Sequence, residues 1–124
     1  MEVKTGIDII EVKRIQEAIE KQGERFLNRV YTPVEIAYCE HTGKMKYQHY
    51  AARFAAKEAI FKAISSKLPS GVGDVWTKIE IQNDETKKPI AHLEELNLGN
   101  IESMDLSISH IAEYAVASFT IIFS

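Results

Sequence analysis

Hydrophobic residues in the first half of the chain recur at the spacing of amphipathic helices. Val12, Ile15 and Ile19 share one helical face, and Gly23 is a typical stop signal after them. A strong start signal follows at residues 32–35, where threonine can cap, proline suits the first helical position and glutamate completes a capping box. These signals predict helices over residues 11–22, 24–30, 33–41 and 44–66.

One position breaks the longest of these patterns. Tyr47, Ala51, Phe54 and Phe61 follow one another at steps of three or four, which predicts a stripe that faces the core. Glu58 lies within this stripe. A carboxylate on a core-facing line is costly unless it is paired or bound to a metal, so Glu58 is the most informative single residue of the chain.

The second half of the chain alternates instead of following a helical period. Ile79 and Ile81 alternate with polar residues, as in a half-buried strand, and a polar turn at residues 83–88 predicts a hairpin. Residues 94–100 are typical of a loop or a short helical turn. The expected strands cover residues 3–10, 76–82, 89–93, 104–110 and 114–123. A run of helices followed by a run of strands favours an α+β fold, with N-terminal helices packed on a mainly antiparallel sheet.

Length and composition restrict the number of domains and the class of protein that this sequence can form. The chain has 124 residues, enough for one domain over residues 1–124, and 45% hydrophobic residues indicate a globular protein. The net charge of -3 argues against a general nucleic-acid binder. One cysteine, Cys39, excludes an intrachain disulfide, and no stretch is apolar and long enough for a signal core or a membrane span. We therefore expect a cytoplasmic protein with no membrane partner.

The net charge conceals a basic segment. Residues 41–67 carry six lysine or arginine residues and a single acid, Glu58. Such a concentration suggests an anionic ligand. The alternative is an ordinary solvated helix face, on which Glu58 forms a helix ion pair with Lys62, four residues further on.

Asp8 resembles Glu58 in its setting, because it places one charge inside an apolar strand next to a helix start. The simpler alternative is an aspartate that caps the following helix. Taken together, however, two carboxylates on separate elements could share one Mg²⁺ ion, which completes its shell with water and substrate phosphates. Arg53, Lys57 and Lys62 would hold the remaining phosphate charge.

His110 ends a predicted strand whose alternation places it on the same face as Ile108. A lone histidine is more often structural than catalytic, so it would need a substrate nearby. Sequence motifs for a phosphate-binding loop, a dinucleotide-binding turn and a nucleophile elbow are all absent.

Four segments together resemble one known family over essentially the whole chain. They are Gly-Ile-Asp-Ile-Ile-Glu-Val-Lys-Arg-Ile at residues 6–15, Thr-Pro-x-Glu at 32–35, Arg-Phe-Ala-Ala-Lys-Glu-Ala at 53–59 followed by Lys-Ala at 62–63, and Ser-Ile-Ser-His at 107–110 followed by Tyr-Ala at 114–115. These motifs resemble the holo-acyl-carrier-protein synthases. The resemblance implies the 4′-phosphopantetheinyl transferase fold and the transfer of the 4′-phosphopantetheine arm of coenzyme A to a serine of apo acyl carrier protein, with release of 3′,5′-ADP.

The resemblance also implies roles for single residues. Asp8 and Glu58 would bind Mg²⁺, and Lys62 would neutralise phosphate charge and could assist the leaving phosphate. The proton acceptor stays open between Glu58, acting through a metal-bound water, and His110.

Further implied roles concern other chains. Arg53 and His110 would reach the coenzyme from a neighbouring subunit, because members of this family are homotrimers with sites at the subunit interfaces. Arg14 would contact acidic residues of the carrier protein. Three features depart from the family pattern: Lys87 stands where glycine is common, Phe61 stands where a small residue is common, and the loop over residues 65–73 is longer than usual. Contacts with the adenine end of the coenzyme are therefore the part of the family's site that is least transferable to this chain.

Two alternatives to the transferase remain at this point. One is a non-catalytic module on the same scaffold that binds coenzyme A or a carrier protein. The other is an unrelated nucleotide-binding α+β protein, in which Glu58 and Lys62 would form only an ion pair.

Overall fold

The computed structural model describes residues 1–124 and has five strands and four α-helices, joined by loops and short 3₁₀ turns. The helices are α1 (Val12–Gln22), α2 (Glu24–Val30), α3 (Pro33–Glu40) and α4 (Lys46–Ile64). The strands are β1 (Glu2–Glu11), β2 (Glu80–Asn83), β3 (Pro89–His92), β4 (Ile101–His110) and β5 (Tyr114–Phe123). The predicted α+β class is confirmed, and the capping box at Thr32 and Glu35 forms as expected.

The strands form two antiparallel sheets. The larger sheet has the order β1-β5-β4, and β2 and β3 form a separate hairpin. In the larger sheet Asp8 lies opposite Ala117, which in turn lies opposite Ile108. β1 and β4 are therefore the two edges, separated by β5.

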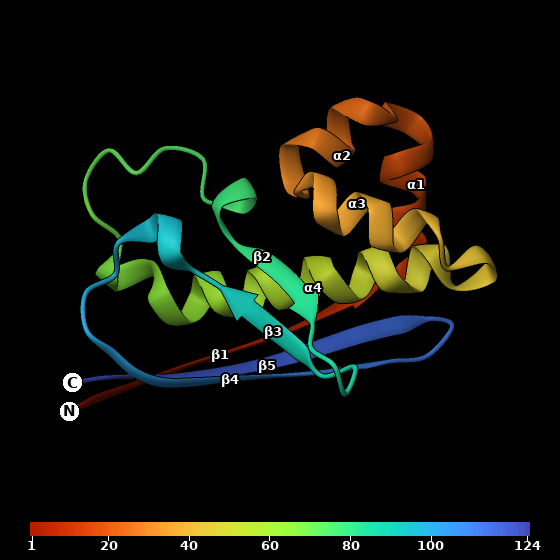
Figure 1. Cartoon of the computed structure of the whole chain (residues 1–124). Coiled ribbons are helices and arrows are strands. Elements are labelled where there is room, and N and C mark those ends of the chain that lie inside the picture. The colour runs from red at the N-terminus through yellow and green to blue at the C-terminus, as the bar shows by residue number, and fades with distance from the viewer.

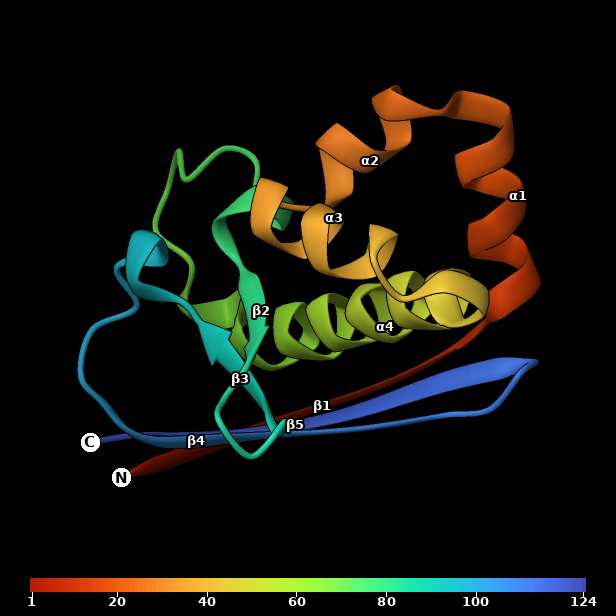
Figure 2. The same cartoon turned by 45° about the vertical axis from the view of Figure 1, so that its right-hand side comes forward.

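α4 is the central element of the molecule. It lies along one face of the larger sheet, and α1, α3 and the hairpin cover its other side (Figures 1 and 2). The buried positions of α4 include six alanines, whose small side chains let neighbouring elements approach closely: Ala51, Ala52, Ala55, Ala56, Ala59 and Ala63. The fold thus places a helix rich in charged residues between a sheet and a helical layer.

The predicted core-facing stripe on α4 is correct only in part, because Ala51 is fully buried and Tyr47 and Phe54 pack against the core, but the remaining positions are not core positions. Phe54, Glu58 and Phe61 lie on the least buried side of the helix, and Phe61 is 39% exposed. The alanine side packs on the sheet instead, because the distance between α4 and the strands admits only small side chains. Glu58 is therefore half-buried at the margin of the helix rather than enclosed in the core.

The strand predicted over residues 76–82 is shorter than expected, because Trp76–Lys78 form a 3₁₀ turn and pairing begins at Glu80. Ile79 and Ile81 are buried, as the alternation predicted. The turn brings Trp76 against Phe54 of α4, with ring centroids 5.4 Å apart and nearly parallel planes.

Gly6 determines how closely β1 approaches α4. A Cβ atom at this position would lie 1.8 Å from the carbonyl oxygen of Ala59. Because that neighbour is backbone, the substitution Gly6→Ala forces strand and helix apart, and we expect it to lower the free energy of unfolding by about 3 kcal/mol. Chemical denaturation measures this loss. The control Thr5→Ala changes an exposed side chain on the same strand and should stay near wild type, and equal stability of Gly6→Ala would contradict the close approach.

The second face of the larger sheet is not covered by any element of the chain (Figure 2). Apolar side chains project from it, among them Val3 (56% exposed), Ile7 and Ile9 (each 64% exposed) and Tyr114 (46% exposed). Exposed apolar side chains on an uncovered sheet face are typical of a surface that another protein chain covers.

Candidate functional site

Asp8 and Lys62 meet where β1 crosses α4. Lys62 Nζ lies 3.2 Å from Asp8 Oδ1 and donates a hydrogen bond to the carbonyl oxygen of Ile7 at 3.0 Å. The close approach at Gly6, two residues earlier on the same face of β1, brings these elements together. The other carboxylate oxygen, Asp8 Oδ2, is buried and has no hydrogen-bond partner.

Glu58 completes this cluster from one turn earlier on α4. Partial burial raises the pKa of Glu58, the negative charge of Asp8 raises it further, and Lys62 acts in the opposite direction. Glu58 and Asp8 are therefore close enough for their charges to repel each other, and Lys62 partly offsets this repulsion.

This donor set fits a divalent cation. An unpartnered carboxylate oxygen on Asp8 and a second carboxylate on Glu58 are hard oxygen ligands of the kind that Mg²⁺ prefers. The structure contains no group of three or more His, Cys, Asp or Glu side chains that could hold a metal. A cation here would therefore take its remaining ligands from water and from a bound substrate.

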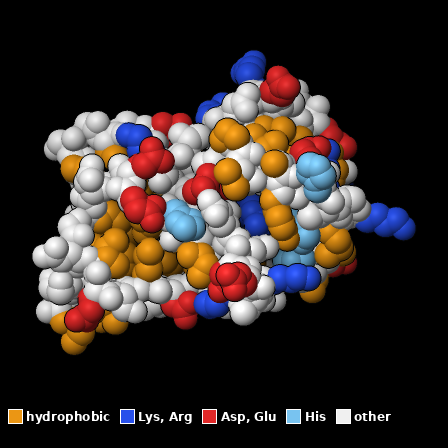
Figure 3. Space-filling view, viewed as in Figure 1, with side chains coloured by type: hydrophobic (Ala, Val, Ile, Leu, Met, Phe, Trp, Pro, Cys, Tyr) orange, Lys and Arg blue, Asp and Glu red, His pale blue; other side chains and the backbone are white.

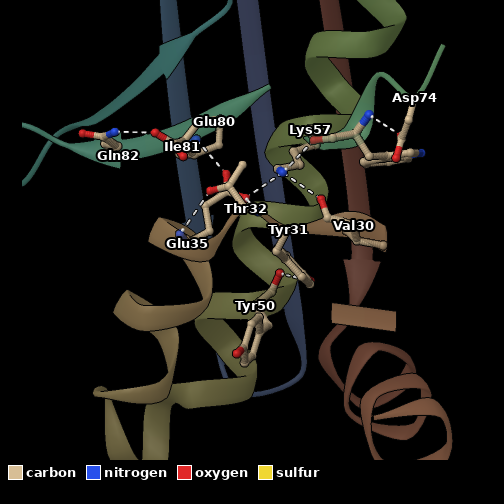
Figure 4. A network of polar contacts seen from close by, with 11 residues as sticks. Val30, Tyr31, Thr32, Glu35, Tyr50, Lys57, Asp74, Glu80, Ile81 and Gln82 are labelled. Atoms are coloured by element: carbon tan, nitrogen blue, oxygen red, sulfur yellow. Dashed lines mark hydrogen bonds and ion pairs between the residues drawn. The ribbon is translucent and has the colours of Figure 1, made fainter. Parts of the chain in front are cut away.

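Lys57 has a different role from the one expected. It is fully buried, lies 2.6 Å from Glu35 Oε1, and donates to the carbonyl oxygens of Val30 at 2.7 Å and Trp76 at 2.8 Å (Figure 4). The prediction that Lys57 holds phosphate charge is wrong, because all of its hydrogen atoms are already used inside the protein.

Glu35 is equally enclosed. Its carboxylate accepts from the backbone N–H of Thr32 at 2.9 Å and of Ile81 at 2.7 Å, in addition to the contact with Lys57. Burial raises the pKa of Glu35 and lowers that of Lys57, and each partner opposes the shift of the other. The pair joins α3, α4, β2 and the turn at Trp76 into one unit.

A second polar hollow, of about 160 Å³, contains Arg53 and His110. Arg53 is only 5% exposed, its guanidinium lies 4.1 Å from the ring centre of Tyr38, and its Nε atom has no hydrogen-bond partner. His110 Nδ1 lies 2.8 Å from Gln48 Oε1. The buried cation is suited to an anionic group that enters the hollow.

The two clusters are separate within one chain. Asp8 lies on the β1 edge of the sheet and His110 on the β4 edge, so β5 separates them by about 10 Å. Arg53 lies five residues before Glu58 on α4, which turns it away from the Asp8 side. The structure therefore brings Asp8, Glu58 and Lys62 together, and it brings Arg53 and His110 together, but it does not join the two groups.

Comparison with known proteins identifies the family. A model described as the 4′-phosphopantetheinyl transferase superfamily matches residues 4–119. The chain belongs to this superfamily. The resemblance inferred from the motifs is thereby confirmed.

Curated relatives support this membership of the 4′-phosphopantetheinyl transferase superfamily. A holo-[acyl-carrier-protein] synthase of Solibacter usitatus is 45% identical over 94% of this chain and 95% of its own length. One from Ruminiclostridium cellulolyticum is 43% identical over 94% of this chain and 90% of its own length.

Solved structures agree with the fold. A holo-(acyl-carrier-protein) synthase from Bacillus anthracis in complex with CoA (3′,5′-ADP) has a TM-score of 0.78 and 34% identity, and the match covers 98% of this chain and 96% of that one. The enzyme from Helicobacter pylori in complex with coenzyme A has a TM-score of 0.74 and 31% identity, and the match covers 95% of this chain and 99% of that one.

In this member of the superfamily the hairpin places a further lysine at the second hollow. Lys87 lines this hollow together with His49. Its φ of 67° lies in the left-handed region, which glycine adopts with the least strain. A glycine would avoid the backbone strain at this position, whereas the lysine adds a cation to the hollow that contains Arg53. Sequence reasoning noted the departure at Lys87 but missed His49, which has no distinguishing neighbours in the sequence.

Arg14 lies exposed on α1. A further hollow of about 570 Å³ is formed by the segment between β3 and β4 and the start of β4, and it is lined mainly by apolar and amide residues, with Glu94 as its one charged group. Figure 3 shows hydrophobic side chains gathered on this part of the surface. Without a cation or paired carboxylates, this hollow is less suited to a phosphate-containing ligand than either cluster.

None of the helices combines the length and the apolar character needed to cross a membrane.

Proposed function

We propose that this protein transfers the 4′-phosphopantetheine group of coenzyme A to a serine of an apo acyl carrier protein and releases 3′,5′-ADP. The observation that carries the proposal is the cluster of Asp8, Glu58 and Lys62, with a buried carboxylate oxygen that no protein group satisfies. The names of the relatives and the coenzyme complexes of the solved structures support the same reaction.

The reaction forms one bond and breaks another at a single phosphorus. The serine oxygen bonds to the phosphorus that carries the pantetheine arm, the bond from this phosphorus to the bridging oxygen breaks, and 3′,5′-ADP leaves with that oxygen. Bound at Asp8 and Glu58, Mg²⁺ would supply charge stabilisation for the pyrophosphate. Lys62, half exposed beside Asp8, is free to turn toward the leaving phosphate and offset its growing charge.

The serine proton needs an acceptor, and the candidates are Glu58 and His110. Glu58, if it holds Mg²⁺, would act through a metal-bound water rather than accept the proton directly. His110 would serve only if a neighbouring chain brings it to the reacting group.

A homotrimer fits this division of the site. The apolar second face of the larger sheet offers a surface for self-association, and association would let the hollow of one chain approach the carboxylates of another. Arg53 and His110 would then hold anionic groups of the coenzyme. Arg14, together with other basic side chains of α1, would contact an acidic carrier protein.

The variant Ile9→Lys should disrupt this assembly. Ile9 lies near the end of β1 on the uncovered face and is 64% exposed in the isolated chain, so a lysine there leaves the fold intact but introduces a charge into an apolar interface. Light scattering coupled to size exclusion should report three chain masses for the wild type and one for the variant. The control Val34→Lys, on α3 and 49% exposed, should remain trimeric. A monomeric wild type would contradict the proposed trimer.

Mass spectrometry of an apo acyl carrier protein tests the function directly. After incubation with the protein, Mg²⁺ and coenzyme A, the carrier should gain the mass of one phosphopantetheine group, and 3′,5′-ADP should appear in equal amount. Binding of coenzyme A without any gain in mass would instead favour the non-catalytic binding module on the same scaffold.

A further inference from the structure

The turn between β2 and β3 has a fixed internal shape. Asp84 Oδ1 accepts from the backbone N–H groups of Thr86 at 2.8 Å and Lys88 at 3.0 Å, and the N–H of Asp84 donates to the carbonyl oxygen of Lys88 at 2.8 Å. Lys87 lies within these hydrogen bonds and adopts its positive φ there. An aspartate that binds several backbone groups of one turn keeps that turn in a single shape, so the turn moves as one piece.

This turn forms one wall of the second hollow. Asn83, Lys87 and Pro89 line the hollow from the hairpin, whereas Arg53 and His110 line it from α4 and β4. The width of the hollow therefore depends on where the hairpin lies relative to α4 and the sheet. An anionic group can contact the cations of both walls at once only while this width is kept.

Few contacts fix the turn relative to the sheet. The hairpin shares no strand pairing with the larger sheet, and a cavity of about 110 Å³ is lined by residues 89–91 of β3 and 104–106 of β4. The turn reaches the sheet beside β4 (Figures 1 and 2), where Lys88 Nζ lies 2.9 Å from Asp105 Oδ1 and donates to the carbonyl oxygen of Leu106 at 3.4 Å. All polar contacts between the turn and the sheet therefore come from Lys88.

Asp105 is placed to act through Lys88 alone. Its exposed carboxylate accepts one other hydrogen bond, from the backbone N–H of Leu106 at 3.0 Å. The hydrogen bond from Lys88 lowers the pKa of Asp105, so the carboxylate is charged near neutral pH and the ion pair persists there. Asp105 does not line the second hollow, so it affects a ligand there only by holding the turn.

We propose that Asp105 is a positioning residue for coenzyme binding, because its ion pair with Lys88 holds the turn in place as one wall of the second hollow. This inference rests on the proposed function, in which the hollow binds an anionic group of the coenzyme. Its sign is opposite to that of simple electrostatics. Removal of a negative charge by itself strengthens the binding of an anion, whereas release of the turn weakens it.

Isothermal titration with coenzyme A measures the effect on binding. Asp105→Asn should raise the dissociation constant about threefold to fivefold, which is the range of an exposed ion pair, and Lys88→Met should raise it by a similar factor. In the transfer assay the KM for coenzyme A should rise by the same factor, whereas kcat and the KM for the carrier protein should change by less than about twofold. Glu102→Gln, at another exposed carboxylate of β4, is the matched control and should bind coenzyme A as the wild type does. Unchanged or tighter binding by Asp105→Asn would overturn the proposal.

Exchange of the two charges provides the second measurement. The double variant Lys88→Asp with Asp105→Lys restores the ion pair in reverse, so its dissociation constant should return to within about twofold of the wild-type value, whereas each single reversal should weaken binding. If the exchange fails to restore binding, Lys88 contacts the coenzyme itself and the positioning role of Asp105 is wrong.

Two further readouts separate this role from other effects. Size exclusion should give the same mass for Asp105→Asn as for the wild type, and a changed mass would overturn the proposal because Asp105 would then act on assembly. A wild type that binds coenzyme A but leaves the carrier unmodified would contradict the proposed function and not the role of Asp105. A wild type that does not bind coenzyme A would overturn both.

Discussion

The substitution Asp8→Asn is expected to reduce Mg²⁺-dependent transfer to the carrier protein by about a thousandfold. The side chain keeps its size, but it loses the charge that would hold the cation together with Glu58. Asp8 Oδ2 is buried and unpartnered in the wild type, so the amide must place either its oxygen or its NH₂ group where a cation should lie. Single-turnover labelling of apo carrier protein, followed by mass spectrometry, measures the loss.

A second readout separates this effect from a general disturbance. Because the charge of Asp8 raises the pKa of Glu58, its removal should lower that pKa, so Glu58 stays ionised to a lower pH in the variant. Titration followed by NMR of the side-chain carboxyl groups measures this shift. Glu95→Gln, at an exposed carboxylate in the turn after β3, is the control and should transfer at the wild-type rate. Normal transfer by Asp8→Asn would contradict the assignment of Asp8 to the cation.

The substitution Lys57→Met should cost about 3–5 kcal/mol of folding free energy, because it leaves Glu35 fully buried without its cation. It also removes the donor to the carbonyl oxygens of Val30 and Trp76. Denaturant unfolding at one fixed protein concentration measures the loss, since stability of an oligomer depends on concentration. Lys46→Met is the matched control: its partner Glu40 lies 3.1 Å away at the surface, and its loss should cost less than about 1 kcal/mol.

The loss in Lys57→Met should also depend on pH. Burial raises the pKa of Glu35, and removal of Lys57 raises it further. Glu35 then binds its proton more tightly in the folded than in the unfolded state, so the free energy of unfolding falls as the pH rises above the unfolded pKa. The deficit of the variant should be smaller near pH 5 than near pH 8. A deficit as small as that of Lys46→Met at both values would contradict the role of this buried pair.

The sequence by itself determined most of the elements and the family. The spacing of Val12, Ile15 and Ile19 and the capping box at Thr32 and Glu35 are local signals, and local signals depend only on neighbouring residues. The alternation at Ile79 and Ile81 is of the same kind. The family could be identified from the sequence because its motifs are also local and follow one another in a fixed order along the chain.

Only the tertiary structure decided which face of α4 is buried and what its charged residues do. Both sides of this helix are covered, so its periodicity did not distinguish the alanines on the sheet from the stripe of Phe54, Glu58 and Phe61 near the surface. Lys57 and Lys62 are five residues apart in one basic segment, yet one is fully enclosed with Glu35 and the other lies half exposed beside Asp8. Their partners come from distant parts of the chain, and the free energy of a charge depends on what surrounds it in space.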